Sequence, residues 1–148
     1  MAWRFVMKEL ITKADTDNLP EVLEFLEGYL EEKDCSPKAS MQLAIALEEM
    51  FVNIAHYAYE GSSLPDDERT AKITIEDTET DGSEAVCVSL TDRGKPYDPL
   101  AKEDPDTTLS AQEREIGGLG IFMVKKSMDS VSYKRVDDMN IFTMEKKI

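Results

Sequence analysis

The chain has 148 residues, 41% of them hydrophobic, which is enough for one ordinary core, so we expect a single domain over residues 1–148. Its 17 basic and 31 acidic residues give a formal net charge of −14. This charge argues against direct binding to nucleic acid or to an anionic membrane, and it favours a partner with basic patches. The first residues do not resemble a secretory signal, and no segment has the roughly eighteen apolar residues of a membrane span, so we expect a cytoplasmic protein.

The N-terminal part predicts one strand followed by two helices. Residues 3–11 alternate loosely and predict a first strand at a sheet edge. Residues 17–34 predict an amphipathic helix, and residues 36–60 predict a long, largely buried helix that starts at Ser36 and Pro37. The apolar stripe of the first helix consists of Val22, Phe25, Leu26, Tyr29 and Leu30.

Next comes a predicted hairpin, with strands at residues 71–77 and 84–92 and a turn signal at Asp81 and Gly82. The following two dozen residues, through Ile116, show no sustained period and predict a long loop. Loops of that length inside a compact domain are usually functional lids or disordered.

A glycine cluster, a helix and two closing strands, at residues 130–136 and 140–148, complete the order. Strands joined by hairpins rather than by alternating crossovers favour an α+β sandwich, with helices on one face of a mostly antiparallel sheet.

The glycine cluster lies in the stretch "IGGLGIFMVKK". Gly117, Gly118 and Gly120 precede the predicted helix, where free N–H groups and the helix dipole attract phosphate and glycines allow close approach. A tight turn is the alternative for this stretch alone. The side chains expected to anchor the helix in the core are Ile121, Met123 and Val124.

Polar side chains interrupt the long helix at Glu49, Asn53 and His56, whose spacing of i, i+4 and i+7 predicts one shared face. Amide and carboxylate oxygens suit Mg²⁺, and a carboxylate one turn away can take a proton from a hydroxyl or water. The alternative is a solvated stripe.

A third motif, "TDRGKPYDP", places Asp92 at the end of a strand with Gly94 two residues on. A buried carboxylate there can accept a hydrogen bond from an exocyclic amine such as that of adenine, and the glycine would let the base approach. The same pattern also makes an ordinary turn.

Together and in this order, Glu49-x-x-x-Asn53, Asp92-x-Gly94-x-Pro96 and Gly117-Gly118-Leu119-Gly120 resemble the nucleotide-binding boxes of the GHKL ATPase superfamily. Within it, "EEMFVNIAHYAY", "DRGKPYDP", "REIGGLGIFMVKKSMD" and "NIFTMEK" are similar to the anti-sigma factor serine kinases, over essentially the whole chain. The resemblance implies a Bergerat-type two-layer sandwich, with a mostly antiparallel mixed sheet covered on one face by helices.

The resemblance also implies residue roles. Asn53 would hold Mg²⁺ bridging the ATP phosphates, Glu49 would be the general base, and Asp92 would recognise the adenine amine. Gly94 and the segment Gly117-Gly118-Leu119-Gly120 would shape the pocket and lid. Arg114 would reach the γ-phosphate, with a salt bridge to an acidic residue as the alternative.

Two departures concern the rim of this site. Tyr97 stands where relatives commonly have phenylalanine, and "DDMN" replaces a Gly-Thr pair, so only Asn140 or Thr143 would supply a polar contact from the last strand. The single histidine, His56, lies beside Asn53, and the chain ends at Ile148, so we expect neither a complete sensor kinase nor a gyrase-like ATPase with a transducer domain.

The implied function is that of an ATP- and Mg²⁺-dependent serine/threonine protein kinase in transcription regulation. It would phosphorylate a small anti-anti-sigma (STAS-type) protein and sequester a sigma factor, and it would form a homodimer through its first strand. The alternatives are an ATP-responsive binding module without phosphotransferase activity and a small acidic protein with no ligand.

Overall fold

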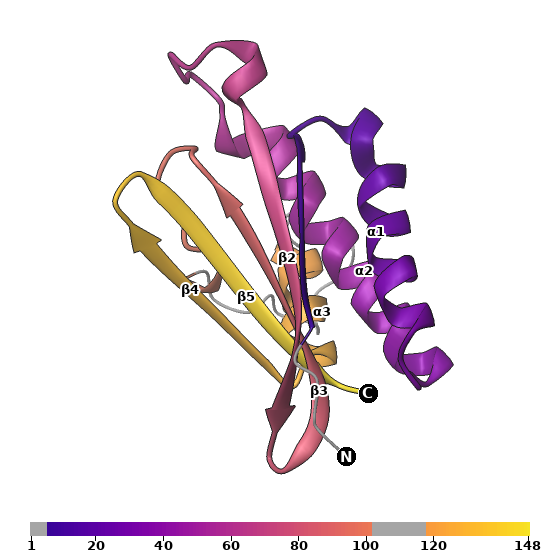
Figure 1. Ribbon diagram of the computed structural model, residues 1–148. Helices are drawn as coiled ribbons and strands as arrows, with labels where there is room; N and C mark the ends of the chain where they lie inside the picture. The colour runs from indigo at the N-terminus through magenta and orange to yellow at the C-terminus, as the bar shows by residue number, and fades with distance from the viewer. Residues whose placement is uncertain (1–5, 102–117) are drawn as a thin grey trace.

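The computed structural model describes residues 6–101 and 118–148 (Figure 1). Strands and α-helices make up most of these residues. In chain order they are β1 Met7–Lys13, α1 Leu19–Glu31, α2 Pro37–Asn53, β2 Thr70–Thr80, β3 Ser83–Asp92, α3 Gly118–Ser127, β4 Ser130–Val136 and β5 Met139–Lys147. The short helical turns between them are η1 Thr16–Asn18, the π-helical η2 Ile54–Ala58, η3 Asp66–Glu68 and η4 Pro99–Ala101.

The strands form one sheet in the order β1-β2-β3-β5-β4, and the helices cover one of its faces (Figure 1). This arrangement confirms the predicted α+β two-layer sandwich, with β1 at an edge. The described sheet is antiparallel at every strand pair rather than mixed. The crossover through α3 joins β3 to the parallel strand β4, but β5 lies between them, so no parallel pair forms.

The predicted hairpin is present between β2 and β3. Asp81 and Gly82 both have positive φ, 51° and 79°, as expected for the two central residues of a turn that matches the twist of its strands. The turn sets the register that places Ile75 opposite Val88 and Ala71 opposite Asp92. Asp92 is therefore the last residue of β3, at the end of the sheet where β2 begins and next to the C-terminal end of α2.

The core lies between the helices and the covered face of the sheet. The predicted stripe of α1 packs there through Val22, Leu26, Tyr29 and Leu30, while Phe25 is only partly buried at its margin. Helix α2 begins as predicted, since the Ser36 hydroxyl accepts a hydrogen bond from the Ala39 N–H at 3.1 Å. The largest fully buried side chains are Tyr29, Phe51, Leu26, Leu43, Leu47, Ile73, Ile75, Leu90, Met144, Val22, Val86 and Val88. Burying each large apolar side chain contributes about 1.5–3 kcal/mol.

A buried carboxylate on β2, Asp77, ties α1 to the sheet. The Lys33 ammonium lies 2.7 Å from it, the Tyr29 hydroxyl donates to it, and the Val6 N–H donates at 3.1 Å. Burial alone would raise the pKa of Asp77, but these donors and the charge of Lys33 outweigh burial and lower the pKa below 3.8. Asp77 is thus a charged, fully partnered element of the scaffold.

Two predicted helix boundaries were wrong. The long helix is regular only to Asn53 and then widens into the π-helical turn of η2. Helix α3 begins at Gly118, so Gly118 and Gly120 lie inside its first turn rather than before it. Ile121 and Val124 anchor α3 as expected, but Met123 is 53% exposed because it lies two residues, or about 200°, from Ile121.

Cys87 is buried on β3, and burial raises the pKa of its thiol to about 11. Among the described residues, no helix combines the length and the apolarity needed to cross a lipid bilayer.

Candidate functional site

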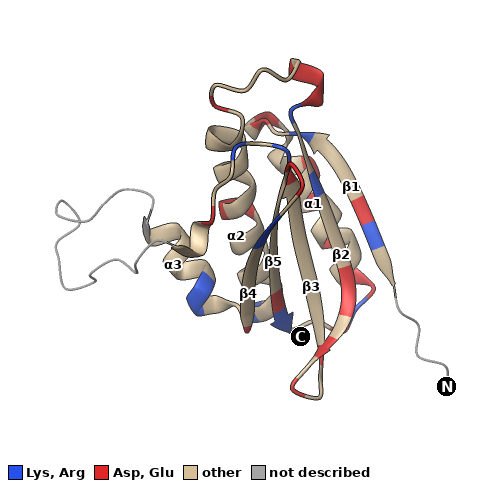
Figure 2. Cartoon of the chain, turned by 90° about the vertical axis from the view of Figure 1, so that its left-hand side faces the viewer, with Lys and Arg blue, Asp and Glu red and all other residues tan. Residues whose placement is uncertain are grey.

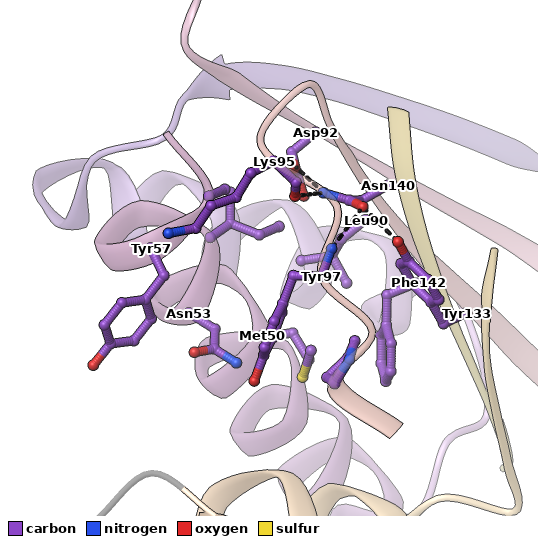
Figure 3. A pocket seen from close by; sticks show the side chains of 13 residues that line it. Met50, Asn53, Tyr57, Leu90, Asp92, Lys95, Tyr97, Tyr133, Asn140 and Phe142 are labelled. Atoms are coloured by element: carbon purple, nitrogen blue, oxygen red, sulfur yellow. Dashed lines mark hydrogen bonds between the residues drawn. The ribbon is translucent and has the colours of Figure 1, made fainter. Parts of the chain in front are cut away.

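A cavity of about 360 Å³ opens between the C-terminal end of α2 and the ends of β3, β4 and β5 (Figure 3). Its walls are mainly apolar and aromatic, with a few polar groups, as is usual for small-molecule sites. The lining residues are Met50, Asn53, Ile54, Tyr57, Ala58, Leu90, Asp92, Lys95, Tyr97, Pro99, Tyr133, Asn140 and Phe142. The cavity brings together Asn53 and Asp92, which are 39 positions apart in the sequence.

Asp92 supplies the buried acidic group of this cavity, with 7% of its surface exposed. Its Oδ1 accepts a hydrogen bond from the Gly94 N–H at 2.8 Å. The same oxygen accepts one from Asn140 Nδ2 at 3.0 Å (Figure 3). Burial raises the pKa of Asp92, although these two donors and the charge of Arg135 act in the opposite direction. None of the described residues donates to Oδ2, so this oxygen remains to accept a hydrogen bond from a ligand.

Gly94 is required by a close backbone contact. A Cβ at this position would lie 2.2 Å from the Ala58 carbonyl oxygen, and the next N–H, of Lys95, donates to that same oxygen at 3.0 Å. The turn after Asp92 therefore packs directly on the π-helical turn. This contact explains why residue 94 is a glycine, independently of its expected position beside a base.

The π-helical turn also redirects the polar face predicted on the long helix. Asn53 lines the cavity, but His56 lines a second, polar hollow with Lys13, Asp66 and Arg69. The expectation that His56 shares a face with Asn53 was wrong, because the wider π-helical turn changes the angle between successive side chains. The same turn places Tyr57 on the cavity side.

Glu49 and Gly120 meet where α2 packs on α3. A Cβ on Gly120 would lie 2.0 Å from Glu49 Oε1, so any larger residue here would require the Glu49 carboxylate to move from its place beside the first turn of α3. Glu49 is half-buried and lies one helical turn before Asn53, but it is not among the residues that line the cavity.

The remaining predicted site residues lie near or beyond the start of α3. Gly118 is its first residue, and Leu119 is 40% exposed. Arg114 and Gly117 fall outside the described residues. The first N–H groups of an α-helix have no partner within the helix, and they are the groups that favour an anion.

Of the two polar candidates on the last strand, Asn140 lines the cavity and Thr143 does not. The Thr143 hydroxyl lies 3.1 Å from the Ser89 hydroxyl on the uncovered face of the sheet. The strand period of two explains the difference, since Asn140 and Phe142 share the covered face with Met144.

Sequence reasoning missed several cavity residues, notably Tyr57, Lys95 and Tyr133. Tyr133 belongs to β4, the edge strand farthest from β1, and its hydroxyl donates to Asn140 Oδ1 at 2.6 Å. A usable signal existed in the alternation of residues 130–136, which places Tyr133 on the same face of the strand as Val131 and Arg135. In the ladder Tyr133 then lies opposite Phe142.

The oxygen donors present fit the way in which proteins hold Mg²⁺. In the described ranges no group of three histidine, cysteine or acidic residues forms a metal cage. The half-buried amide of Asn53 instead offers a single hard oxygen beside the cavity. Mg²⁺ usually keeps several waters and binds one or two protein oxygens together with substrate phosphates, so one amide is an adequate protein contribution.

Comparison with known proteins finds similarity in sequence and in fold. The family model of the histidine kinase-like ATPase domain matches residues 12–146. The chain is also similar to the serine/threonine-protein kinase BtrW of Bordetella bronchiseptica, with 24% identity over 124 residues that make up 84% of this chain and 82% of that protein.

Two solved structures share the fold. One contains the RsbU and RsbW domains of Rv1364c from Mycobacterium tuberculosis, with a TM-score of 0.62 and 14% identity over 96% of this chain. The match covers 32% of that longer chain. The other is the SiaB–SiaC complex from Pseudomonas aeruginosa, with a TM-score of 0.58, 19% identity, and coverage of 95% of this chain and 89% of that chain.

Proposed function

Because the chain belongs to the histidine kinase-like ATPase domain family, we propose that it is a Mg²⁺- and ATP-dependent serine/threonine protein kinase of the anti-sigma type. The observation that carries this proposal is the placement of Asn53 and Asp92 in the lining of one cavity, with Glu49 one turn before Asn53. The similarity to a serine/threonine kinase supports the same class of reaction.

In this proposal Asp92 accepts a hydrogen bond from the adenine amine through its unoccupied oxygen. The apolar walls, including Leu90 and Phe142, enclose the base and exclude water. The first N–H groups of α3, from Gly118 to Gly120, favour the phosphates, with Gly117 and Arg114 as further proposed contacts. A magnesium ion held by Asn53 neutralises phosphate charge when bound.

Phosphotransfer then requires a group that accepts the proton of a serine or threonine hydroxyl. Glu49 is the proposed base: it takes this proton as the hydroxyl oxygen bonds to the γ-phosphorus and the bond to the ADP oxygen breaks. Gly120 leaves space for the Glu49 carboxylate beside the start of α3. The arrangement works mainly by positioning and electrostatics, as phosphoryl transfer generally does.

The proposed partners are an anti-anti-sigma (STAS-type) protein as phosphate acceptor and a sigma factor that the chain sequesters. Support comes from the similarity in fold to part of a chain that contains RsbU and RsbW domains and to one chain of the SiaB–SiaC complex. Exposed acidic residues lie at both ends of the sheet, in η3 and around the β2–β3 turn, and they favour partners with basic surfaces (Figure 2).

A homodimer through β1 is part of the proposal. Met7 and Ile11 on this edge strand are 53% and 65% exposed, and they point away from the helices. Unpaired edge strands with exposed apolar side chains are natural sites for pairing with another chain.

The first test is calorimetric titration with ADP and with a non-hydrolysable ATP analogue, each with and without Mg²⁺. We expect micromolar, metal-dependent binding. Asn53→Ala should abolish the metal dependence, and affinity retained unchanged by this variant would contradict the metal assignment.

The second test separates binding from transfer. Glu49→Gln should bind nucleotide as the unaltered chain does but should no longer transfer labelled phosphate to purified STAS-type proteins. Transfer that survives this substitution would exclude Glu49 as the base.

A second candidate function is an ATP-responsive binding module without transferase activity. The observation that favours it is the position of Glu49, which lies against Gly120 and outside the cavity lining. In that case the unaltered chain would bind ATP and a partner protein, and labelled phosphate would never reach the partner.

A further inference from the structure

Asn140, the second residue of β5, is the hydrogen-bonding centre of the cavity wall. It is 6% exposed and lies directly opposite Asp92 in the β3–β5 ladder. Its Oδ1 accepts from Tyr133 at 2.6 Å, from Arg135 at 3.2 Å and from the Tyr97 N–H at 3.4 Å. Its Nδ2 donates to Asp92 at 3.0 Å and to the Lys95 carbonyl at 2.8 Å.

These partners determine which way the amide points. The Arg135 guanidinium and the Tyr97 N–H can only donate, and the Lys95 carbonyl can only accept. A flipped amide would face donors with its NH₂ and acceptors with its oxygen, so it would lose these bonds. The hydrogen-bond network therefore fixes Nδ2 toward Asp92 (Figure 3).

The fixed amide in turn orients the Asp92 carboxyl group. Asp92 Oδ1 receives two donors, Asn140 Nδ2 and the Gly94 N–H, and so it must act as an acceptor. The other oxygen, Oδ2, receives no donor from the described residues. An ionised Asp92 held in this way presents a bare acceptor, which suits a base with an amine and repels a base with a carbonyl oxygen at the same position.

We infer that Asn140 is a positioning residue that, with Tyr133 and Arg135 of β4, holds Asp92 as a hydrogen-bond acceptor and so sets selectivity for an amine-bearing purine. This inference rests on the proposed nucleotide site and adds to it the cause of its base preference. It also assigns β4 a role in the site, although this edge strand contributes no residue from any of the three sequence motifs.

Arg135 strengthens this arrangement from a second direction. Its Nη1 donates to the Gly94 carbonyl at 2.8 Å as well as to Asn140 Oδ1, so one guanidinium holds both the turn after Asp92 and the amide that faces it. Its charge also favours the ionised form of Asp92. Arg135 and Asn140, which lie directly opposite each other in the β4–β5 ladder, thus both support the carboxylate.

A pH profile reports this role because the donors affect the protonation of Asp92. The ionisable groups around it are Arg135 from β4, Tyr133 from β4, Lys95 and Arg93 from the following loop, and Tyr59 after η2. Burial raises the pKa of Asp92, and the Asn140 bond lowers it. Removing Asn140 should therefore raise this pKa further. As the pH falls, binding that needs the ionised form should then begin to weaken at a higher pH than in the unaltered chain.

The experiment measures binding of ADP and of inosine diphosphate, whose base has a carbonyl oxygen in place of the amine, across pH 4.5 to 8. The variants are Asn140→Ala and the milder Tyr133→Phe, which removes one hydroxyl and keeps the amide. Ser132→Ala, on the exposed face of the same strand, is the matched control. Circular dichroism confirms that each variant is folded.

For Asn140→Ala we expect the ratio of ADP to inosine diphosphate affinity to fall by roughly tenfold, the effect of losing one hydrogen bond to a charged group. The acid limb of ADP binding should move to higher pH. Tyr133→Phe should shift both quantities in the same direction by less, and Ser132→Ala should shift neither.

If ADP affinity falls for both variants while the base ratio and the acid limb stay unchanged, the inference is wrong and Asn140 is only structural. If Asn140→Ala does not fold, the base ratio and the acid limb measured for Tyr133→Phe decide the question by the same criterion. No ADP binding by the unaltered chain would instead refute the nucleotide site itself, so the two failures are distinguishable.

Discussion

Asp77 and Asp92 are two aspartates on the covered face of adjacent strands, 5% and 7% exposed, yet their environments differ sharply. Asp77 has an ammonium at 2.7 Å and two further donors, and its pKa is lowered. Asp92 lines the cavity, has two neutral donors on one oxygen and none from the described residues on the other, and has a raised pKa. Burial is therefore a poor guide to the role of a carboxylate, whereas unsatisfied acceptor capacity beside a cavity indicates a ligand.

The largest expected effect comes from removing the charge at the cavity. Asp92→Asn keeps an oxygen that can accept from Asn140 and Gly94 but turns an NH₂ group toward the ligand. We expect ADP affinity to fall by about a hundredfold or more, because a donor then faces the adenine amine. Calorimetric titration measures this loss, with Asp138→Asn in the exposed β4–β5 turn as control.

The same substitution at the other aspartate should act on stability instead. Asp77→Asn leaves the largely buried Lys33 ammonium without its counter-ion, so we expect a loss of about 2–3 kcal/mol in the free energy of unfolding, with unchanged ADP affinity. Urea denaturation measures the loss. Glu32→Gln, which breaks the exposed 3.8 Å pair with Lys8, should cost no more than about 0.5 kcal/mol. Equal effects of the two variants would contradict the scaffold role of Asp77.

The backbone beside Asp92 offers a smaller test. At Gly94→Ala the new methyl group meets the Ala58 carbonyl, which is backbone and cannot move aside, so we expect about 1–3 kcal/mol of destabilisation. Gly28→Ala in α1 is the matched control, since a Cβ there meets nothing within 4 Å. It should stabilise the chain by about 0.5–1 kcal/mol. A neutral Gly94→Ala would show that the turn after Asp92 is not fixed by this contact.

The contrast between the two aspartates also shows what the sequence could predict. Asp92 could be predicted from the sequence because a strand pattern ends on it and a turn signal follows. Asn53 could be predicted because it is a polar residue that interrupts an apolar helix. Asp77 had no such signal, since its partner Lys33 lies 44 positions away in the turn that follows α1. The amide of Asn140 meets Asp92 only because β5 inserts between β3 and β4, and strand order of this kind depends on the whole sheet.

Local rules failed for the same reason at the helix ends. The π-helical turn of η2 places Asn53 and His56 in different hollows, although their spacing suits one face of an α-helix. The tight contact of Gly120 with Glu49 depends on how α3 packs on α2, which no periodicity within α3 encodes. The hairpin turn at Asp81 and Gly82 was predictable because its backbone conformation depends on those two residues themselves.

The smallest expected effect is also the sharpest test of the comparison, because the two aspartates should respond to acid in different pH windows. A lowered pKa means that Asp77 contributes stability above the ordinary value of 3.8, and this contribution disappears as the pH falls through the lower, folded-state value. A raised pKa means the reverse for Asp92: its buried charge costs stability at neutral pH, and protonation relieves this cost between the raised value and 3.8. The unaltered chain should therefore be less stable than Asp92→Asn at pH 7, and the gap should close above pH 3.8. The opposite gap to Asp77→Asn should close only below pH 3.8. If both gaps closed in one window, the two carboxylates would share one kind of environment, and Asp92 would lose its distinction as the group that awaits a ligand.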